Sequence, residues 1–288
     1  MIRDILNWRK ILHIYNLNWR DNMSVNIGFI GVGSMGTAIF DSLIKEECQI
    51  TKSIYLYDID ISKGLKLKKL YDVNVASSVK DIASHCDVIV LAVRPETLDS
   101  VFLELSKVLT HQILISVAVG ITLDKLSGLA ERDVTIVRTM PNIGAMIGSS
   151  MTGYCVNKDM SENEANIIDS FLTCFGKAVQ VKEEKFDEFT ALCGSSPAFH
   201  LEIMESMINY GLNHQFSYED TVKMVTETMI TSAKLLQESS LSPRELIERI
   251  ATKGGTTEAG LNVLKKYQIQ KVINETLLAT ENESKITK

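Results

Sequence analysis

Apolar and polar positions alternate between two periods along the first two thirds of the chain. Short runs rich in β-branched residues predict strands at Val25–Ile30, Ile54–Asp58, Asp87–Val93, Ile113–Ala118 and Val134–Thr139. Helical patterns between them predict helices at Met35–Lys45, Ser62–Leu70 and Glu96–Leu109. Asp87–Val93 is apolar almost throughout, which is typical of a strand buried on both faces of a parallel sheet. This alternation predicts an α/β fold with a Rossmann-like, doubly wound sheet.

A change of pattern near residue 185 indicates a second domain. Two later strands are predicted at Thr152–Val156 and Ala178–Val181, around a helix that Ser161 and Glu164 would begin as a capping box. Beyond that point strand patterns stop, and helical patterns run to a polar tail. Ser242-Pro243-Arg244-Glu245 has the cap serine, first-turn proline and glutamate of a helix start. We therefore expect an all-helical C-terminal domain at 185–288 after a sheet domain at 23–184.

The apolar faces of this helical region suggest self-association. Residues on one face of a predicted helix are all apolar: Val222, Val225, Met229, Ala233 and Leu236. A region of this size with many such faces commonly packs against a second copy of itself. We expect at least a homodimer.

Residues 1–22 form a separate extension. They combine two tryptophans with basic residues, but they lack a clean apolar core and a small-residue cleavage site, so a secretory signal is not expected. Met23 stands just before the first predicted strand, which favours it as the natural start. A partner-binding or membrane-surface arm is the alternative.

Composition narrows the function classes. The 288 residues carry a formal charge of −6, whereas a general nucleic-acid binder would carry a basic surplus. No stretch of about 18 apolar residues predicts a membrane span. The five cysteines are scattered and have no CxxC spacing, which predicts a reduced cytoplasmic protein without a disulfide framework or a zinc site. The histidines form no evident cluster, and no metal is suggested.

The first motif with chemical content is G-x-G-x-x-G, formed by Gly31, Gly33 and Gly36. It directly follows a predicted strand and directly precedes a predicted helix, which is the context that a dinucleotide-binding turn requires. Gly31 would make the tight turn, Gly33 would let the backbone approach a pyrophosphate, and Gly36 would let the helix pack closely. Ser34 and Met35 complete the cofactor-binding loop.

Other predicted cofactor residues stand where strands end. Asp58 follows the second strand, where an acid binds the adenosine ribose hydroxyls and repels a 2′-phosphate. It favours NADH, although Lys63 and Lys66 leave NADPH open, and Asp58 could instead be a helix cap or a turn residue. Ala92-Val93-Arg94-Pro95 and Ala118 follow two further strands and are predicted to line the nicotinamide half of the cofactor. Arg94 could equally be a solvated arginine.

Two further segments predict a substrate site in the helical region. Gly254-Gly255-Thr256-Thr257 runs into a helical pattern, and the exposed N–H groups of such a start suit a small anion. Gly194-Ser195-Ser196-Pro197-Ala198-Phe199 can be interpreted simply as a helix start capped by its serines.

Together these motifs resemble those of the pyrroline-5-carboxylate reductases. That family has G-x-G-x-x-G, a "VKP" strand end, an "MPN" turn (here Met140-Pro141-Asn142), a "GSGPA" helix and a "KGGTT" segment, and the resemblance covers Val25 to Leu278. This chain departs from the family pattern at four places. Arg94 stands where the family has lysine, Ile143-Gly144 where it has Thr-Pro, Ser196 where it has glycine, and Glu227 where it often has glutamine.

The resemblance implies reduction of 1-pyrroline-5-carboxylate to L-proline by NAD(P)H, the last step of proline synthesis, in a homodimer or a decamer of five dimers. It implies a cofactor role for Asn142 and a donor role for the Thr257 hydroxyl at the ring nitrogen. The substrate carboxylate would lie on the Gly254-Gly255-Thr256-Thr257 backbone, with Thr252, Ser195 and Glu205 nearby, although Glu205 could equally be a surface residue.

Two alternative functions remain. One is a reductase of another imine or of a hydroxy acid, although Pro197–Tyr210 lacks the lysine that a related hydroxy-acid dehydrogenase would carry. The other is a nucleotide-binding regulatory paralogue of low activity, which the departures at Ser196 and Ile143-Gly144 motivate.

Overall fold

The computed structural model describes residues 24–46, 48 and 50–286. It contains two compact units. The first extends through Gly194 and includes the chain from Glu283 onward, and the second is Ser195–Asn282. No helix in the described residues is long and apolar enough to cross a membrane.

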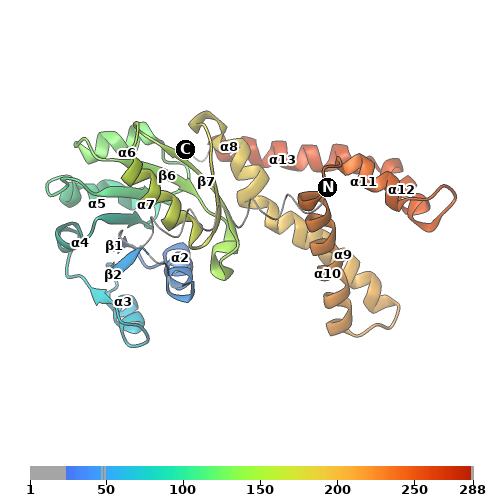
Figure 1. Cartoon of the computed structure of the whole chain (residues 1–288), viewed down its shortest axis with the longest axis horizontal. Helices are drawn as coiled ribbons and strands as arrows, with labels where there is room; N and C mark the ends of the chain where they lie inside the picture. The colour runs from blue at the N-terminus through green and yellow to red at the C-terminus, as the bar shows by residue number, and fades with distance from the viewer. Residues whose placement is uncertain (1–23, 47, 49, 287–288) are drawn as a thin grey trace, which may run out of the picture. The chain divides into compact units, whose positions relative to one another are not determined.

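One twisted sheet organises the first unit (Figure 1). Within the described residues its strand order is β3-β2-β1-β4-β5-β6-β7-β8. All neighbours from β3 to β6 are parallel, β7 is antiparallel to β6, and β8 is parallel to β7. The predicted doubly wound sheet is confirmed. The strands are β1 (Val25–Ile30), β2 (Thr51–Tyr57), β3 (Asn74–Val75), β4 (Val88–Leu91), β5 (Ile113–Ser116), β6 (Ile136–Met140), β7 (Ser150–Val156) and β8 (Gly176–Gln180).

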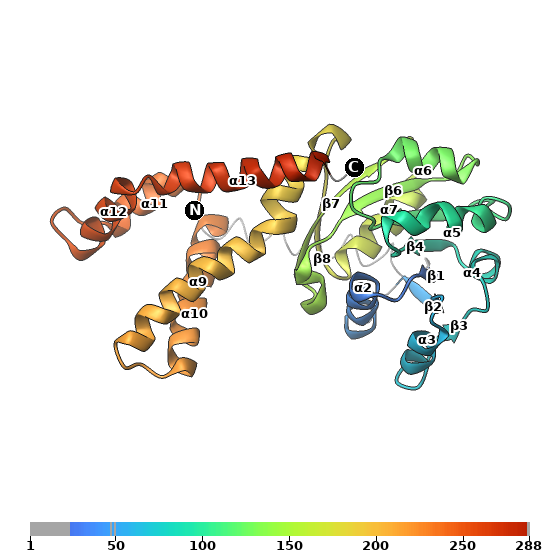
Figure 2. The same cartoon turned by 180° about the vertical axis from the view of Figure 1, so that it is seen from behind.

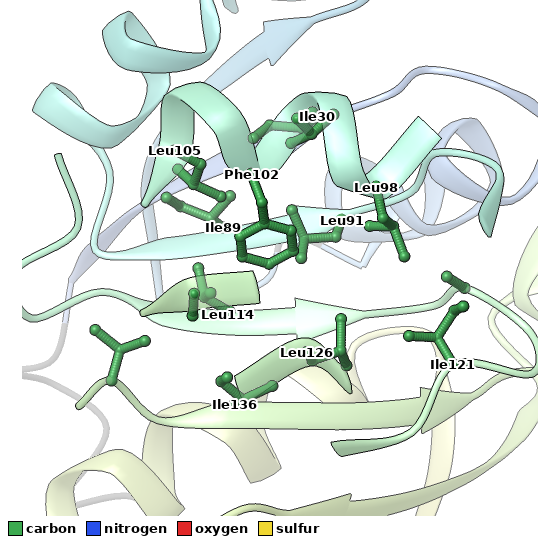
Figure 3. Packing of buried hydrophobic residues seen from close by; sticks show 14 of the residues in the cluster. Ile30, Ile89, Leu91, Leu98, Phe102, Leu105, Leu114, Ile121, Leu126 and Ile136 are labelled. Atoms are coloured by element: carbon green, nitrogen blue, oxygen red, sulfur yellow. The ribbon is translucent and has the colours of Figure 1, made fainter. Parts of the chain in front are cut away.

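Helices cover both faces of the sheet because the central strands are apolar on both sides. Ile89 and Leu91 of β4 pack with α4 (Val79–His85), α5 (Leu98–Leu105) and α6 (Leu123–Ala130), as Figure 3 shows for part of this cluster. Val88 and Val90, the alternate residues, pack with α2 (Ser34–Lys45) and α7 (Glu162–Thr173). Burying each such side chain contributes roughly 1.5–3 kcal/mol.

The predicted elements were correct in type but incomplete. β3, α4 and α6 were missed, and Asp87–Val93 shortens to Val88–Leu91. The missed helices are short, and they begin at side-chain caps: Ser78 Oγ accepts a hydrogen bond from Asp81 N, and Thr122 Oγ1 accepts one from Lys125 N. Both predicted capping boxes, at Ser161 and at Ser242, are confirmed.

A buried arginine holds the segment that leads out of the sheet unit. Arg138 on β6 donates to Glu183 over 2.7 Å, and its guanidinium lies 4.4 Å from the centre of the Phe186 ring. Glu183, in the short helix η3 (Glu183–Lys185), also accepts a hydrogen bond from Leu123 N. These contacts fix the start of the long helical segment against β6 and α6.

After η3, all regular elements of the described residues are helices, as predicted. They are α8 (Phe186–Phe189), the π-helix η4 (Thr190–Ser195), α9 (Ser196–Asn213), α10 (Tyr218–Glu238), α11 (Pro243–Ile250), α12 (Thr256–Lys266) and α13 (Ile269–Ile286). In both views α9 and α10 lie side by side (Figures 1 and 2). There Gly211 is necessary, since a Cβ on it would lie 2.5 Å from Thr221 Cγ2.

The second unit has almost no hydrophobic core of its own. Val225 is the one hydrophobic side chain of Ser195–Asn282 that is buried within this chain. Large apolar side chains on its helices are exposed, including Leu201, Met207, Tyr210, Met224, Val263, Leu264 and Val272. The chain alone therefore does not bury the apolar faces that the sequence predicted.

The expectation of a protein without disulfides was wrong. Cys48, in the loop after α2, is bonded to Cys174, at the end of α7, with 5.7 Å between the two Cα atoms. The pairing could not be deduced from spacing because 126 positions separate the two residues. The thiols of Cys86 and Cys155 are buried, and this burial raises the pKa of each to about 12.

Removing this bridge will destabilise the sheet unit. Replacing both Cys48 and Cys174 by serine should lower the free energy of unfolding by roughly 2–4 kcal/mol, because the bond restricts the unfolded chain. Urea titrations with and without reductant measure this difference. Reductant should weaken the wild type and a Cys193→Ser control but leave the double variant unchanged. Five alkylatable thiols in the untreated protein would contradict the bridge.

Candidate functional site

The glycine turn joins β1 to α2 at the point where the strand order reverses. Gly31 has a φ of +98°, and a Cβ on it would lie 2.6 Å from the carbonyl oxygen of Ala92. A Cβ on Gly36 would lie 2.5 Å from the carbonyl oxygen of Gly31. Around Gly33, by contrast, a Cβ would meet no atom within 4 Å. Two glycines are thus required by packing, whereas the third leaves space beside the backbone, which fits a pyrophosphate.

The start of α2 suits an anion. Gly33 is the N-cap residue and offers no side-chain cap, and the first turn contains no acidic residue. Ser34 is exposed and Met35 is half-buried, so the backbone here is accessible. The N–H groups and the dipole of this helix favour a negatively charged group. The predicted cofactor loop therefore has a suitable geometry.

Asp58 lies beneath this loop rather than capping a helix. Its carboxylate accepts hydrogen bonds from Val32 N at 2.8 Å and from Asp60 N at 3.0 Å. Lys63 Nζ lies 3.1 and 3.2 Å from its two oxygens. Asp60 is the residue that caps α3 (Ile61–Lys68), by accepting from Ser62 N. Asp58 is therefore not a helix cap, whereas the hydrogen bond that it accepts from Asp60 N, two positions along the chain, is that of a turn residue.

These contacts keep Asp58 ionised. Burial by itself would raise the pKa of the carboxyl group, but the N–H groups of Val32 and Asp60 and the ammonium of Lys63 outweigh it and lower the pKa. A charged carboxylate thus remains at the end of β2, where a ribose-binding acid stands in dinucleotide sites.

The other predicted cofactor residues reach the same edge of the sheet because β1, β2, β4, β5 and β6 are parallel. Ala92 and Val93 follow β4 and are half-buried, and Pro95 begins the short helix η1 (Pro95–Thr97). Arg94 is exposed, while Ala118, just beyond β5, is buried. This edge is where ligands bind in sheets of this type.

Asn142 lies at this edge, but its side chain holds the protein's own backbone. Its amide nitrogen donates to the carbonyl oxygen of Cys193 at 3.0 Å, and its amide oxygen accepts from Gly144 N at 2.9 Å. It thereby ties the turn after β6 to the π-helix η4. Gly144 is also required here, since a Cβ on it would lie 2.6 Å from the carbonyl oxygen of Ser149.

In the second unit, the Gly-Gly-Thr-Thr segment forms the start of α12. Gly255 is the N-cap residue, and Gly254 has a φ of +74°. The Gly254 N–H donates to Glu258 Oε2 at 2.7 Å, and the Gly255 N–H donates to the carbonyl oxygen of Thr252. The first-turn N–H groups of Thr256 and Thr257 have no acceptor among the described residues.

The predicted anion-binding turn therefore has fewer open N–H donors than expected. Gly255 was predicted to offer its N–H to a carboxylate, but Thr252 already accepts it. Glu258 was not predicted as part of this turn, although a glutamate four positions after the first glycine of a helix start could have indicated it. The open donors are those of Thr256 and Thr257, both of them exposed residues.

Ser195 and Glu205 both belong to the second unit. The predicted helix start is confirmed, since α9 begins at Ser196 with Pro197 in its first turn, but the predicted serine cap is wrong because Ser195 makes no capping hydrogen bond. The π-helix η4 ends at Ser195 and α9 begins at Ser196, so the two helices are continuous. Glu205 is exposed on α9 and forms no ion pair within the described residues.

No group of three or more side chains that could hold a metal ion is found among the described residues. The described residues offer two helix starts whose N–H groups are open to a hydrogen-bond acceptor, and the Asp58 carboxylate lies beside the first of them.

Comparison with known proteins agrees with this arrangement. Residues 183–286 match the family described as pyrroline-5-carboxylate reductase dimerisation, and residues 26–120 match the family described as NADP oxidoreductase coenzyme F420-dependent.

Pyrroline-5-carboxylate reductase 2 of Bacillus subtilis is 30% identical over 265 residues, covering 90% of this chain and 93% of that protein. Among solved structures, Plasmodium falciparum pyrroline carboxylate reductase with NADP bound is 28% identical with a TM-score of 0.81, covering 92% of this chain and 98% of that one. The Coxiella burnetii enzyme is 27% identical with a TM-score of 0.83, covering 91% and 98%. The chain belongs to the pyrroline-5-carboxylate reductase family.

Proposed function

We propose that this protein reduces 1-pyrroline-5-carboxylate to L-proline with NAD(P)H. The proposal rests on family membership together with two helix starts whose backbone N–H groups are open. One is at Gly33, which has space beside its backbone, and the other is at Thr256 and Thr257. The first suits the pyrophosphate of a dinucleotide, and the second suits a small carboxylate. We assign nucleotide binding to residues 23–184 and substrate and partner binding to residues 185–288.

The substrate is a cyclic imine with one carboxylate. The N–H groups of Thr256 and Thr257 would hold this carboxylate by charge-assisted hydrogen bonds, which are about twice as strong as neutral ones. Gly254, Gly255 and Thr252 shape the turn, and Ser195 and Glu205 are further candidates for substrate contact. The Thr257 hydroxyl would donate to the ring nitrogen as its charge develops.

Bound NAD(P)H supplies the hydride in this reaction. The protein contributes mainly by holding the imine carbon in a reactive position, which can provide roughly 7–11 kcal/mol in well-oriented systems. For the coenzyme we propose a preference for NADH, which the ionised Asp58 supports, with NADPH also accepted. The cytoplasm is the expected compartment, and the Cys48–Cys174 bridge would be an exception there, since disulfides are rare in that compartment.

We further propose a homodimer, or a decamer of five such dimers. Exposed apolar side chains of α9, α10, α12 and the loop between α9 and α10 support this, since they line a groove within the second unit: Ile203, Met207, Tyr210, Phe216, Met224 and Leu264. A unit in which Val225 is the one buried hydrophobic side chain would gain its core by packing against another copy.

The enzyme assay distinguishes this function from a regulatory paralogue. Purified protein with pyrroline-5-carboxylate and either NADH or NADPH should oxidise the coenzyme, and proline should accumulate in equal amount. Nucleotide binding, followed by fluorescence, serves as the control. Normal binding without oxidation of either coenzyme would support the paralogue and contradict the reductase.

Replacing Thr257 by valine should lower kcat by roughly 10²-fold, because it removes a donor that acts on the developing charge. Nucleotide affinity should stay within twofold of the wild type. The matched control is Thr173→Val on α7, whose exposed hydroxyl bonds only to its own helix, at Asp169 O and Ser170 O. Unchanged turnover in the Thr257 variant would remove this residue from the chemistry.

Introducing a charge into the apolar groove should dissociate the oligomer. Met207→Lys places an ammonium on an exposed apolar face of α9, and sedimentation velocity should then show a smaller species than the wild type. Leu103→Lys on α5, also an exposed apolar residue, is the control and should not change the size. A wild type that sediments as a monomer at micromolar concentration would refute the dimer.

A further inference from the structure

The carboxylate of Asp58 has its hydrogen-bonding capacity fully used. Oδ2 accepts from Val32 N and lies 3.2 Å from Lys63 Nζ, whereas Oδ1 accepts from Asp60 N and lies 3.1 Å from the same ammonium. A carboxylate offers about four acceptor positions. The two N–H contacts are built into the backbone, so only the positions held by Lys63 can be exchanged for a ligand.

The pair also changes the electrostatics of this corner. An isolated acid at the end of β2 repels a 2′-phosphate, which is the basis for expecting NADH. Lys63 neutralises that acid locally. Its side chain is 43% exposed, compared with 8% for Asp58, so the lysine can turn toward a ligand while the aspartate stays in place. Asp60 also faces Lys63, but its carboxylate caps α3 by accepting a hydrogen bond from Ser62 N.

We propose that Lys63 determines how well this site accepts a 2′-phosphate. Its ammonium would leave the Asp58 carboxylate and bond to the 2′-phosphate of NADPH instead. This inference rests on the proposed binding of a nicotinamide dinucleotide by the first unit. When the ribose carries free hydroxyls, Lys63 moves away and the hydroxyls take its two positions on Asp58. When the ribose carries a 2′-phosphate, the ammonium bonds to it as a flexible point charge with three donors.

Lys63 and Lys66, both of which the sequence offered as phosphate contacts, are therefore not equivalent. Lys63 lies in the first turn of α3, within reach of Asp58. Lys66 lies in the last turn, is exposed, and forms no ion pair within the described residues. The two lysines thus supply a matched pair for an experiment in which charge is removed from the same helix.

The test measures binding of the full-length protein to adenosine 2′,5′-bisphosphate and to 5′-AMP by calorimetry, so that it does not depend on turnover. Lys63→Met should weaken the bisphosphate by roughly 10- to 100-fold, as expected for loss of a hydrogen bond between charged groups. Binding of 5′-AMP should be unchanged or tighter, because the hydroxyls no longer compete with the ammonium. Lys66→Met should change neither, and Lys63→Arg should retain most of the bisphosphate affinity.

Each outcome decides a separate question. If Lys63→Met leaves the ratio of the two dissociation constants unchanged while the protein still binds 5′-AMP, the role of Lys63 is wrong and the dinucleotide proposal stands. If the wild type binds neither nucleotide, nor NADH, nor NADPH, the proposed function fails and this inference fails with it. Thermal unfolding of each variant checks that the fold is retained.

Discussion

The close packing of the Gly31 turn against the end of β4 is the constraint on which the nucleotide half of the protein depends. A side chain on Gly31 would collide with Ala92, and one on Gly36 would collide with Gly31 itself. These two contacts set how near α2 comes to the sheet. They also place the open backbone of Gly33 and the buried carboxylate of Asp58 at the same edge. The accessible start of α2, which suits an anion, therefore follows from backbone packing.

The parallel sheet was predictable because its signal is local and strong. Val88–Leu91 is buried on both faces and every residue in it is apolar, and the glycine turn directly follows the largely buried strand Val25–Ile30. α3 and α5 were predicted, but α4 and α6, which are about as short, were missed. Their caps, Ser78 and Thr122, were the only strong signals.

The parts of the site that could not be predicted depend on contacts between distant positions. The bond from Asn142 to the backbone of Cys193, which links the turn after β6 to the π-helix, joins positions 51 residues apart, and the predicted cofactor role of Asn142 stays a prediction beside it. The carbonyl oxygen of Thr252 takes the Gly255 N–H, which no residue pattern reveals. The Cys48–Cys174 pairing likewise needs the folded arrangement of α7 and the loop after α2. Sequence gives residue types at a helix start, but not which backbone groups are already satisfied.

The scarcity of buried side chains in the second unit has a consequence for how the protein acquires activity. Because Val225 is the one hydrophobic side chain buried there, the folding free energy of this unit would come largely from surface that the proposed partner copy covers. The population of correctly formed α12 starts then depends on the concentration of the chain as well as on temperature. Specific activity would fall on dilution even when each sheet unit remains folded, so that assembly and the formation of the proposed substrate site would become one process.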